Sequence, residues 1–181
     1  MTSASDIHVA LLRGVNVGGG NKVPMADLRA IATDLGWQSP RTYIASGNVV
    51  FTASGASHDL AARLRGALAA RLGVDVAVMV LSRSTLISAL ATCPWVVDEG
   101  RQVHGFWCEE TPEIDTARAS DLIARTERLE PRGNMVWLYA PDGIGRSALA
   151  AKIGSVIRGT DFTARNLNTW RTLAAMVAGD A

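Results

Sequence analysis

This sequence of 181 residues has few lysines, few cysteines and no long apolar run, and each shortage narrows what the protein can be. Lys22 and Lys152 are the only lysines, and the net charge is +1, so no strong positive field attracts nucleic acid or a membrane. Cys93 and Cys108 are too few for a disulfide framework, which indicates a reducing, cytoplasmic location. No apolar run is long enough to span a bilayer, and residues 1–6 lack the features of a signal peptide.

Familiar catalytic and cofactor motifs are also missing. Neither of the two standard glycine-rich nucleotide fingerprints is present, nor is the nucleophile elbow of the hydrolases. The three histidines, His8, His58 and His104, lack the spacing of metal ligands. The sequence therefore predicts no metal and no cofactor, and it leaves open whether the protein catalyses a reaction.

The most distinctive stretch is a glycine-rich loop from Arg13 to Lys22. An apolar strand, 7–12, precedes it, and Pro24 suits the first position of the helix that follows. The loop contains four glycines, two asparagines and a cation at each end. Glycine allows the positive φ angles at which successive backbone N–H groups form an anion-binding concavity. Since a simple turn does not need this composition, we expect the loop to bind an anion.

A second turn, Ser46-Gly47-Asn48, joins two short strands that are expected over 41–45 and 49–52. A Gly-Asn turn is typical of a tight hairpin and needs no further function. In a β-α-β-β-α-β unit, however, this turn and the loop after the first strand lie at the same end of the sheet. The ligand-binding residues expected there are Arg13, Asn16, Gly18, Gly19, Lys22, Ser46, Gly47 and Asn48.

Apolar periodicity predicts this order of elements twice. The expected fold is α+β, a tandem duplication of a ferredoxin-like β-α-β-β-α-β unit with antiparallel sheets. The first unit is expected over 1–81, a bridging helix and linker over 82–101, and the second unit, with the C-terminal helix, over 102–181. The second unit is expected to contain one helix over 116–128 and another that begins after Ser147 and includes Ile157.

The second copy offers less evidence of a ligand site. Its first loop, 109–115, is acidic where the loop of the first copy is basic. Ferredoxin-like units also bind RNA through aromatic residues on their central strands, and 132–139 is a distant match to that signature. Asn134 and Val136 replace two of the aromatic positions, and Trp137 is expected in the core. RNA binding is therefore the alternative and not the leading hypothesis.

Several segments resemble the domain-of-unknown-function 1697 family of bacterial proteins. These segments are 11–19, 22–25, 43–51 and 163–169. Leu167 stands where family members often carry an aromatic residue. The resemblance covers nearly the whole chain and implies a tandem ferredoxin-like fold, without an established activity. It draws attention to Arg165, Asn166 and Thr169, because they lie at the start of the last helix, where unpaired N–H groups favour an anion. Arg165 and Asn166 are added to the expected ligand-binding residues.

The sequence leads to one main hypothesis about function and one alternative. The main hypothesis is a cytoplasmic protein that binds a small anionic ligand, such as a phosphorylated metabolite or a nucleotide, at the glycine-rich loop of the first unit. The alternative is a protein-interaction or RNA-associated module without a small-molecule site. No membrane partner is expected, and the sequence leaves the oligomeric state open.

Overall fold

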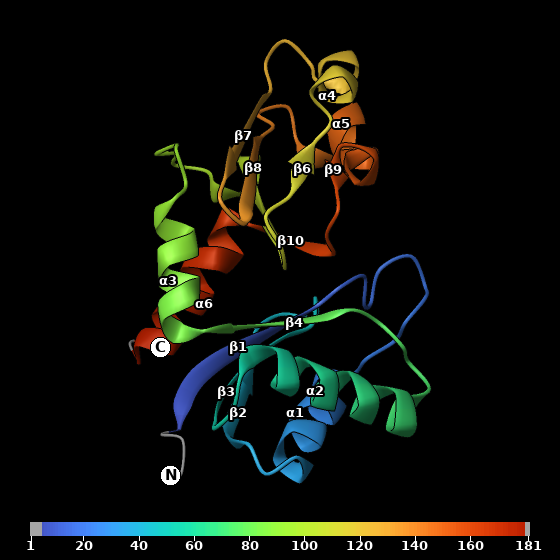
Figure 1. Cartoon of the computed structure of the whole chain (residues 1–181), viewed down its shortest axis with the longest axis vertical. Helices are drawn as coiled ribbons and strands as arrows, with labels where there is room; N and C mark the ends of the chain where they lie inside the picture. Colours follow the sequence, from blue (N-terminus) through green and yellow to red (C-terminus); the bar gives the residue numbers. More distant parts are fainter. Residues whose placement is uncertain (1–4, 180–181) are drawn as a thin grey trace. The chain divides into compact units, whose positions relative to one another are not determined.

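The computed structural model describes residues 5–179, and the chain divides into two compact units (Figure 1). The first unit comprises Met1–Ser88 and Thr172–Ala181, and the second comprises Ala89–Arg171. Each unit contains its own antiparallel sheet with its own buried apolar cluster. The α+β class with antiparallel sheets, which the sequence predicts, is confirmed.

The boundaries between the units fall within helices and not in a linker. Helix α3, Arg83–Ala91, begins in the first unit and ends in the second, and helix α6, Leu167–Ala178, runs from the second unit into the first. The expected bridging segment, 82–101, is therefore divided, and the end of the C-terminal helix is grouped with the first unit. The periodicity of a helix shows that one face is buried but does not show which sheet buries it.

The first unit is a four-stranded antiparallel sheet with α1 and α2 on one face. The strand order is β2-β3-β1-β4, so β1 lies between β3 and β4. Figure 1 shows α1 and α2 side by side against this sheet. The elements are β1 (Asp6–Leu12), α1 (Met25–Asp34), β2 (Gln38–Thr42), β3 (Asn48–Ala53), α2 (Ser57–Leu72) and β4 (Val78–Ser82).

Successive side chains of β1 point to opposite faces of the sheet, and those on the helix-facing side belong to the core of the first unit. Ala10 faces the helices and is fully buried with Leu28 of α1 and Leu64 of α2. Trp37 stacks on Phe51 in the same cluster, with ring centroids 3.8 Å apart and ring planes 9° from parallel. Each leucine buried here contributes about 1.5–3 kcal/mol, so this cluster holds both helices on the sheet.

The second unit has a four-stranded sheet of order β10-β5-β8-β7 and a separate pair of short strands, β6 and β9. Its strands are β5 (Val103–Cys108), β6 (Glu113–Ile114), β7 (Arg128–Arg132), β8 (Met135–Tyr139), β9 (Ile157–Arg158) and β10 (Phe162–Asn166). Its helical segments before α6 are η1 (Gly100–Gln102), α4 (Thr116–Leu122), η2 (Ile144–Arg146), α5 (Ala148–Ala151) and η3 (Ile153–Ser155).

Two helices of the second unit are shorter than the sequence predicts. Helix α4 ends at Leu122 and not near Arg128, because the chain from Arg128 onward pairs with β8 as strand β7. Helix α5 ends at Ala151, and Ile157, expected on its buried face, instead pairs with Ile114 in the small sheet. Short apolar runs satisfy helix and strand spacing equally well, so the pairing partner decides between them.

Trp137 on β8 is fully buried, as the sequence predicts. Its Nε1 donates a hydrogen bond to Thr92 Oγ1 at 2.9 Å, and its ring packs edge-on against Trp170. Gly105 on β5 makes room for these rings, since a Cβ there would lie 2.6 Å from Trp137. The indole is therefore a core side chain and is not exposed for stacking on a nucleobase.

Gly47 in the β2–β3 turn provides a test of close packing in the first unit. Its φ is +79°, and a Cβ there would lie 2.6 Å from Val15 Cγ2 and 2.8 Å from Leu12 Cβ. Gly47→Ala should lower the free energy of unfolding by about 3 kcal/mol or more, because backbone strain adds to steric overlap. Gly36→Ala is the control and should cost only about 1 kcal/mol, since φ is +80° there but the space is open. Equal losses in urea denaturation would contradict the overlap.

Candidate functional site

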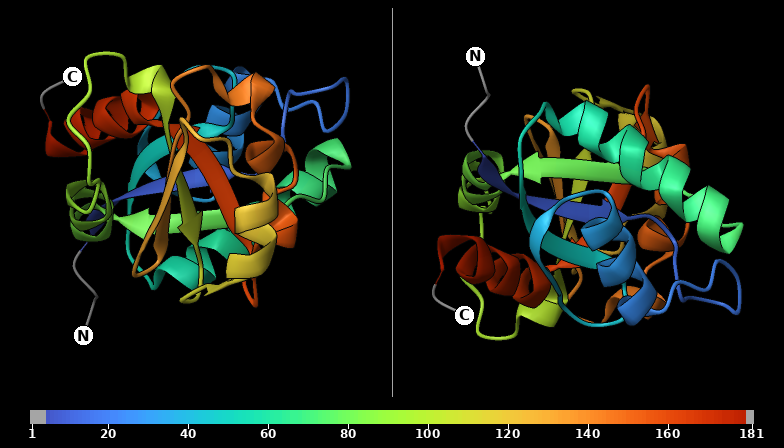
Figure 2. Two further views of the ribbon diagram at one scale, coloured as in Figure 1. Left: turned by 90° about the horizontal axis from the view of Figure 1, so that it is seen from above. Right: turned by 90° about the horizontal axis from the view of Figure 1, so that it is seen from below.

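The glycine-rich loop connects the end of β1 at Leu12 to the start of α1 at Met25. Figure 2 shows it in blue, extending away from the strand and the helix. Five of its residues have φ between +46° and +79°, a region that few residues other than glycine and asparagine adopt easily. These residues are Gly14, Asn16, Gly18, Gly19 and Asn21. The backbone path of the loop therefore accounts for much of its composition.

Asn16 holds this loop closed. Its Nδ2 donates hydrogen bonds to the carbonyls of Val23 at 2.8 Å and Ala45 at 2.7 Å, and its Oδ1 accepts one from the Val23 N–H at 2.9 Å. Its backbone N–H donates to the Asn21 carbonyl at 3.2 Å. The bonds to Val23 and Asn21 close the loop, and the bond to Ala45 joins it to the β2–β3 turn.

The turn is tied to the same end of the sheet by its own hydrogen bonds. The Leu12 N–H donates to the Gly47 carbonyl at 2.9 Å. Asn48 is fully buried, and its Nδ2 donates to the Tyr43 carbonyl at 3.0 Å and to Ser46 Oγ at 2.9 Å. The side-chain amides of both asparagines thus hold the backbone in place, whereas the sequence analysis places both among the expected ligand-binding residues.

The exposed tip of the loop, residues 17–22, carries the groups that a ligand would meet first. Within the described part of the chain, the backbone N–H groups of residues 17–19 donate no hydrogen bond. Lys22 is exposed and forms no ion pair with any residue that the structure describes. Arg13 is exposed at the other end of the loop. Backbone N–H groups beside cations suit an oxyanion.

Two exposed apolar side chains beside the loop were not found from the sequence. Val17 is 61% exposed and Ile44 is 51% exposed. The strand expected over 41–45 ends at Thr42, so Ile44 lies in the turn, with φ at +47°. This angle is unusual for a β-branched residue. No sequence signal reveals it, because isoleucine before a turn is typical of the end of a strand.

The two remaining predicted residues belong to the second unit. Arg165 on β10 is 7% exposed and donates hydrogen bonds to Thr163 Oγ1 at 2.9 Å and the Ala164 carbonyl at 2.7 Å. Burial lowers the pKa of Arg165 to about 10, so its guanidinium stays charged at neutral pH. Asn166 Oδ1 accepts the Thr169 N–H at 2.9 Å and so caps α6. Both side chains therefore have structural contacts within the second unit.

A cavity of about 460 Å³ lies beside Asn166 in the second unit. Its charged lining consists of Glu99, Arg101 and Asp142, and Arg101 pairs with Glu99 at 2.8 Å. His104 also lines the cavity, and burial lowers its pKa to about 4, so the ring is neutral at pH 7. With two carboxylates against one guanidinium, the cavity suits an anion less well than the glycine-rich loop does.

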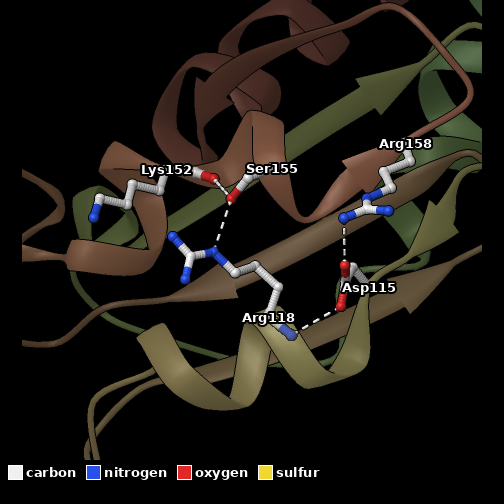
Figure 3. A network of polar contacts seen from close by, with 5 residues as sticks. All are labelled: Asp115, Arg118, Lys152, Ser155 and Arg158. Carbon is white, nitrogen blue, oxygen red and sulfur yellow. Dashed lines mark hydrogen bonds and ion pairs between the residues drawn. The ribbon is translucent and has the colours of Figure 1, made fainter.

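Three cations gather elsewhere in the second unit (Figure 3). Arg158 pairs with Asp115 at 2.5 Å, and Asp115 also caps α4 by accepting the Arg118 N–H at 2.8 Å. Arg118 Nε donates to Ser155 Oγ at 3.4 Å, and this hydroxyl donates to the Lys152 carbonyl at 2.8 Å. Glu113 lies opposite Arg158 in the β6–β9 pair, so three cations and two carboxylates leave this cluster with a charge of +1. An excess of positive charge suits a polyanion at the surface.

Residues 5–179 contain neither a cluster of metal ligands nor a helix that could cross a membrane. No group of three or more His, Cys, Asp or Glu side chains in this part of the chain is placed to hold a metal ion. None of the described helices has the length and apolar character needed to cross a membrane.

The family model described as protein of unknown function (DUF1697) matches residues 6–137. The chain belongs to the DUF1697 family. The matched range includes the glycine-rich loop and the β2–β3 turn but ends before Arg165 and Asn166. No curated protein matches this DUF1697 chain.

A solved structure, that of the conserved bacterial protein SP0830 from Streptococcus pneumoniae, is similar to this DUF1697 protein. The TM-score is 0.73 at 26% sequence identity, and the alignment covers 96% of this chain and 99% of that chain. The similarity therefore extends over the matched family range and beyond it. The similarity supports the α+β fold, and the description of that protein states no activity.

The three side-chain hydrogen bonds of Asn16 to Val23 and Ala45, here called the Asn16 clamp, can be tested in this DUF1697 protein by a substitution to glycine. Glycine removes the side chain and still adopts the positive φ of residue 16. Asn16→Gly should lower the free energy of unfolding by about 2–3 kcal/mol, because three hydrogen bonds are lost. Asn21→Gly is the control, since Asn21 also has positive φ and its side chain bonds to no described residue. It should change stability by about 0.5 kcal/mol or less. Similar losses in both variants would contradict the clamp.

His104 gives the protein a predicted pH dependence of stability. Its pKa is about 4 in the folded chain against 6.5 for an ordinary histidine, so between these values only the unfolded state binds the proton. The free energy of unfolding should therefore fall as the pH falls from 6.5 to 4, by at most roughly 3 kcal/mol. Burial also lowers the pKa of His8, which adds to the effect in the same direction.

His104→Gln should remove most of this pH dependence, as measured by chemical denaturation over the same range. His58→Gln is the matched substitution at an exposed histidine and serves as the control. A His104→Gln protein with the same pH profile as the parent would show that the ring titrates normally in the folded chain.

Proposed function

We propose that this protein binds a small anionic, phosphate-bearing ligand at the glycine-rich loop of its first unit. The observation that carries the proposal is the Asn16 clamp, which fixes the base of the loop through three hydrogen bonds. The tip, residues 17–22, is left exposed, and the backbone N–H groups of residues 17–19 donate to no described residue. A loop that is already held in one shape loses less conformational entropy when a ligand binds.

Two cations complete the proposed site. Arg13 can donate two parallel N–H groups to a phosphate, and Lys22 adds a compact point charge. Gly18 and Gly19 would form its floor, because a backbone without Cβ atoms lets an anion approach the N–H groups closely. Ser46 would add a hydroxyl from the turn. The proposal relies on first-unit residues alone, and Arg165 is not needed for it.

Two broader features belong to the same proposal. We propose that the fold is a tandem duplication of a ferredoxin-like unit, because the orders β2-β3-β1-β4 and β7-β8-β5-β10 place corresponding strands in the same positions. Gly47 and Gly133, both with positive φ, stand in corresponding turns. A cytoplasmic location is proposed with it, and the free thiols of Cys93 and Cys108 support this.

Thermal denaturation with inorganic phosphate, sugar phosphates and nucleotides tests the proposal, because a ligand that binds only the folded state raises Tm. Lys22→Gln should weaken binding by about tenfold or more through loss of a charge-assisted contact, with Tm of the ligand-free protein unchanged. Arg13→Ala should abolish binding. Lys152→Gln is the matched control, because Lys152 is the only other lysine in the chain.

Two results would contradict the proposal. If no phosphate compound raises Tm but RNA does, with steep salt dependence, the RNA-associated alternative is favoured. The contact surface would then be the cluster of Arg118, Lys152 and Arg158 (Figure 3), whose charge suits a polyanion. If Arg13→Ala lowers Tm of the ligand-free protein, Arg13 is a structural residue and the assignment fails.

A further inference from the structure

Val17 and Ile44 present apolar side chains to solvent beside the proposed anion site. They are 61% and 51% exposed. Ile44 also holds φ at +47°, a conformation that strains a β-branched residue and is kept in proteins mainly where function requires it. Asparagine would adopt this angle more easily and would suit an exposed position better. Packing within the described chain therefore does not account for an isoleucine here.

Asn16 brings together the chain segments that carry these two residues and Lys22. The bond from its Nδ2 to the Ala45 carbonyl, 2.7 Å long, joins the residue before Val17 to the residue after Ile44. Asn16 also bonds to the backbone of the residue directly after Lys22. Val17, Lys22 and Ile44 each follow or precede in sequence one of the residues joined by these bonds, so their Cα atoms lie about 3.8 Å from those of Asn16, Val23 and Ala45 respectively. The chain segments that carry Lys22 and the two apolar residues therefore meet at Asn16.

We infer that the ligand of the glycine-rich loop is a phosphate monoester whose organic part is a short apolar group. The phosphate lies on the loop tip between Arg13 and Lys22, and the apolar group contacts Val17 and Ile44. This inference rests on the proposed function, because it names the class of ligand for the same site. It also gives a reason for the strained conformation of Ile44, which places an apolar contact next to a polar loop.

The size and charge of the surface favour a soluble ligand over a membrane. Two aliphatic side chains cover only a few carbon atoms of a ligand. The loop carries two cations and the whole chain has a net charge of +1, whereas attachment to an anionic bilayer requires a polybasic patch or an acyl anchor. A short alkyl phosphate in solution therefore matches the site better than a phospholipid headgroup.

Comparing methyl phosphate with butyl phosphate tests the inference, because the two differ only in three methylene groups. Each methylene that is fully buried strengthens binding about fourfold. Calorimetry should therefore show butyl phosphate binding about tenfold or more tightly than methyl phosphate. In Val17→Thr and Ile44→Asn, butyl phosphate should lose most of this advantage while the affinity for methyl phosphate stays the same. Ile44→Asn should also keep or raise Tm of the ligand-free protein, because asparagine tolerates the angle.

Val96→Thr is the matched control for Val17→Thr, since Val96 is fully exposed in the second unit. It should leave both affinities unchanged. Equal binding of methyl and butyl phosphate would overturn the inference and leave the proposed function standing. If neither compound binds, the proposed function fails and the inference fails with it. Binding to vesicles that contain phosphatidic acid, without binding to butyl phosphate, would show that the ligand is a membrane and would also overturn the inference.

Discussion

The glycine-rich loop lies at one end of the first sheet, and its conformation depends on the side-chain amide of Asn16. A loop of this length has no neighbouring strand to satisfy its backbone polar groups, and each such group that is buried without a partner is costly. Asn16 uses both atoms of its amide, one as a double donor and one as an acceptor, to bond to Val23 and Ala45. One short side chain thereby takes the place of a strand pairing. Its own φ of +56° is one that asparagine tolerates better than most residues.

The close packing at Gly47 also holds the loop and the β2–β3 turn together. The bond from Leu12 to the Gly47 carbonyl brings the turn against the end of β1, and the missing Cβ lets Val15 pack there. The clamp then holds the loop against this turn through Ala45. The two contacts depend on each other, because a turn displaced by a side chain at position 47 would move the carbonyl that Asn16 binds. Such mutual support is what holds a surface loop in a single shape.

Topology was the part of this arrangement that the sequence could predict. Periodicity located most strands, and a β-α-β-β-α-β order places the loop and the turn at one end of the sheet. The roles of Asn16 and Asn48 could not be predicted, because the carbonyls that they bind are defined only by the folded chain. The same reason explains why α4 and α5 are shorter than expected, since strand pairing at Arg128 and Ile157 overrides local spacing. The φ of Ile44 has no sequence signal at all.

The fold itself accounts for part of the composition of the glycine-rich loop. The glycines and asparagines at positive φ are explained by the backbone path, and the amides of Asn16 and Asn48 are explained by their hydrogen bonds. Composition that looked like evidence for an anion site is therefore partly structural.

The features that folding leaves unexplained are fewer and more specific. They are the exposed N–H groups of the tip, the exposed ammonium of Lys22, and two aliphatic side chains in water, one of them strained. None of these features stabilises the folded chain by itself, and Val17, Lys22 and Ile44 each neighbour in sequence a residue of the Asn16 hydrogen-bond network. A ligand with an anionic group and an apolar group would satisfy all of them together, whereas inorganic phosphate alone would leave Val17 and Ile44 in water. For this reason the ligand that we propose is an organic phosphate and not a bare anion.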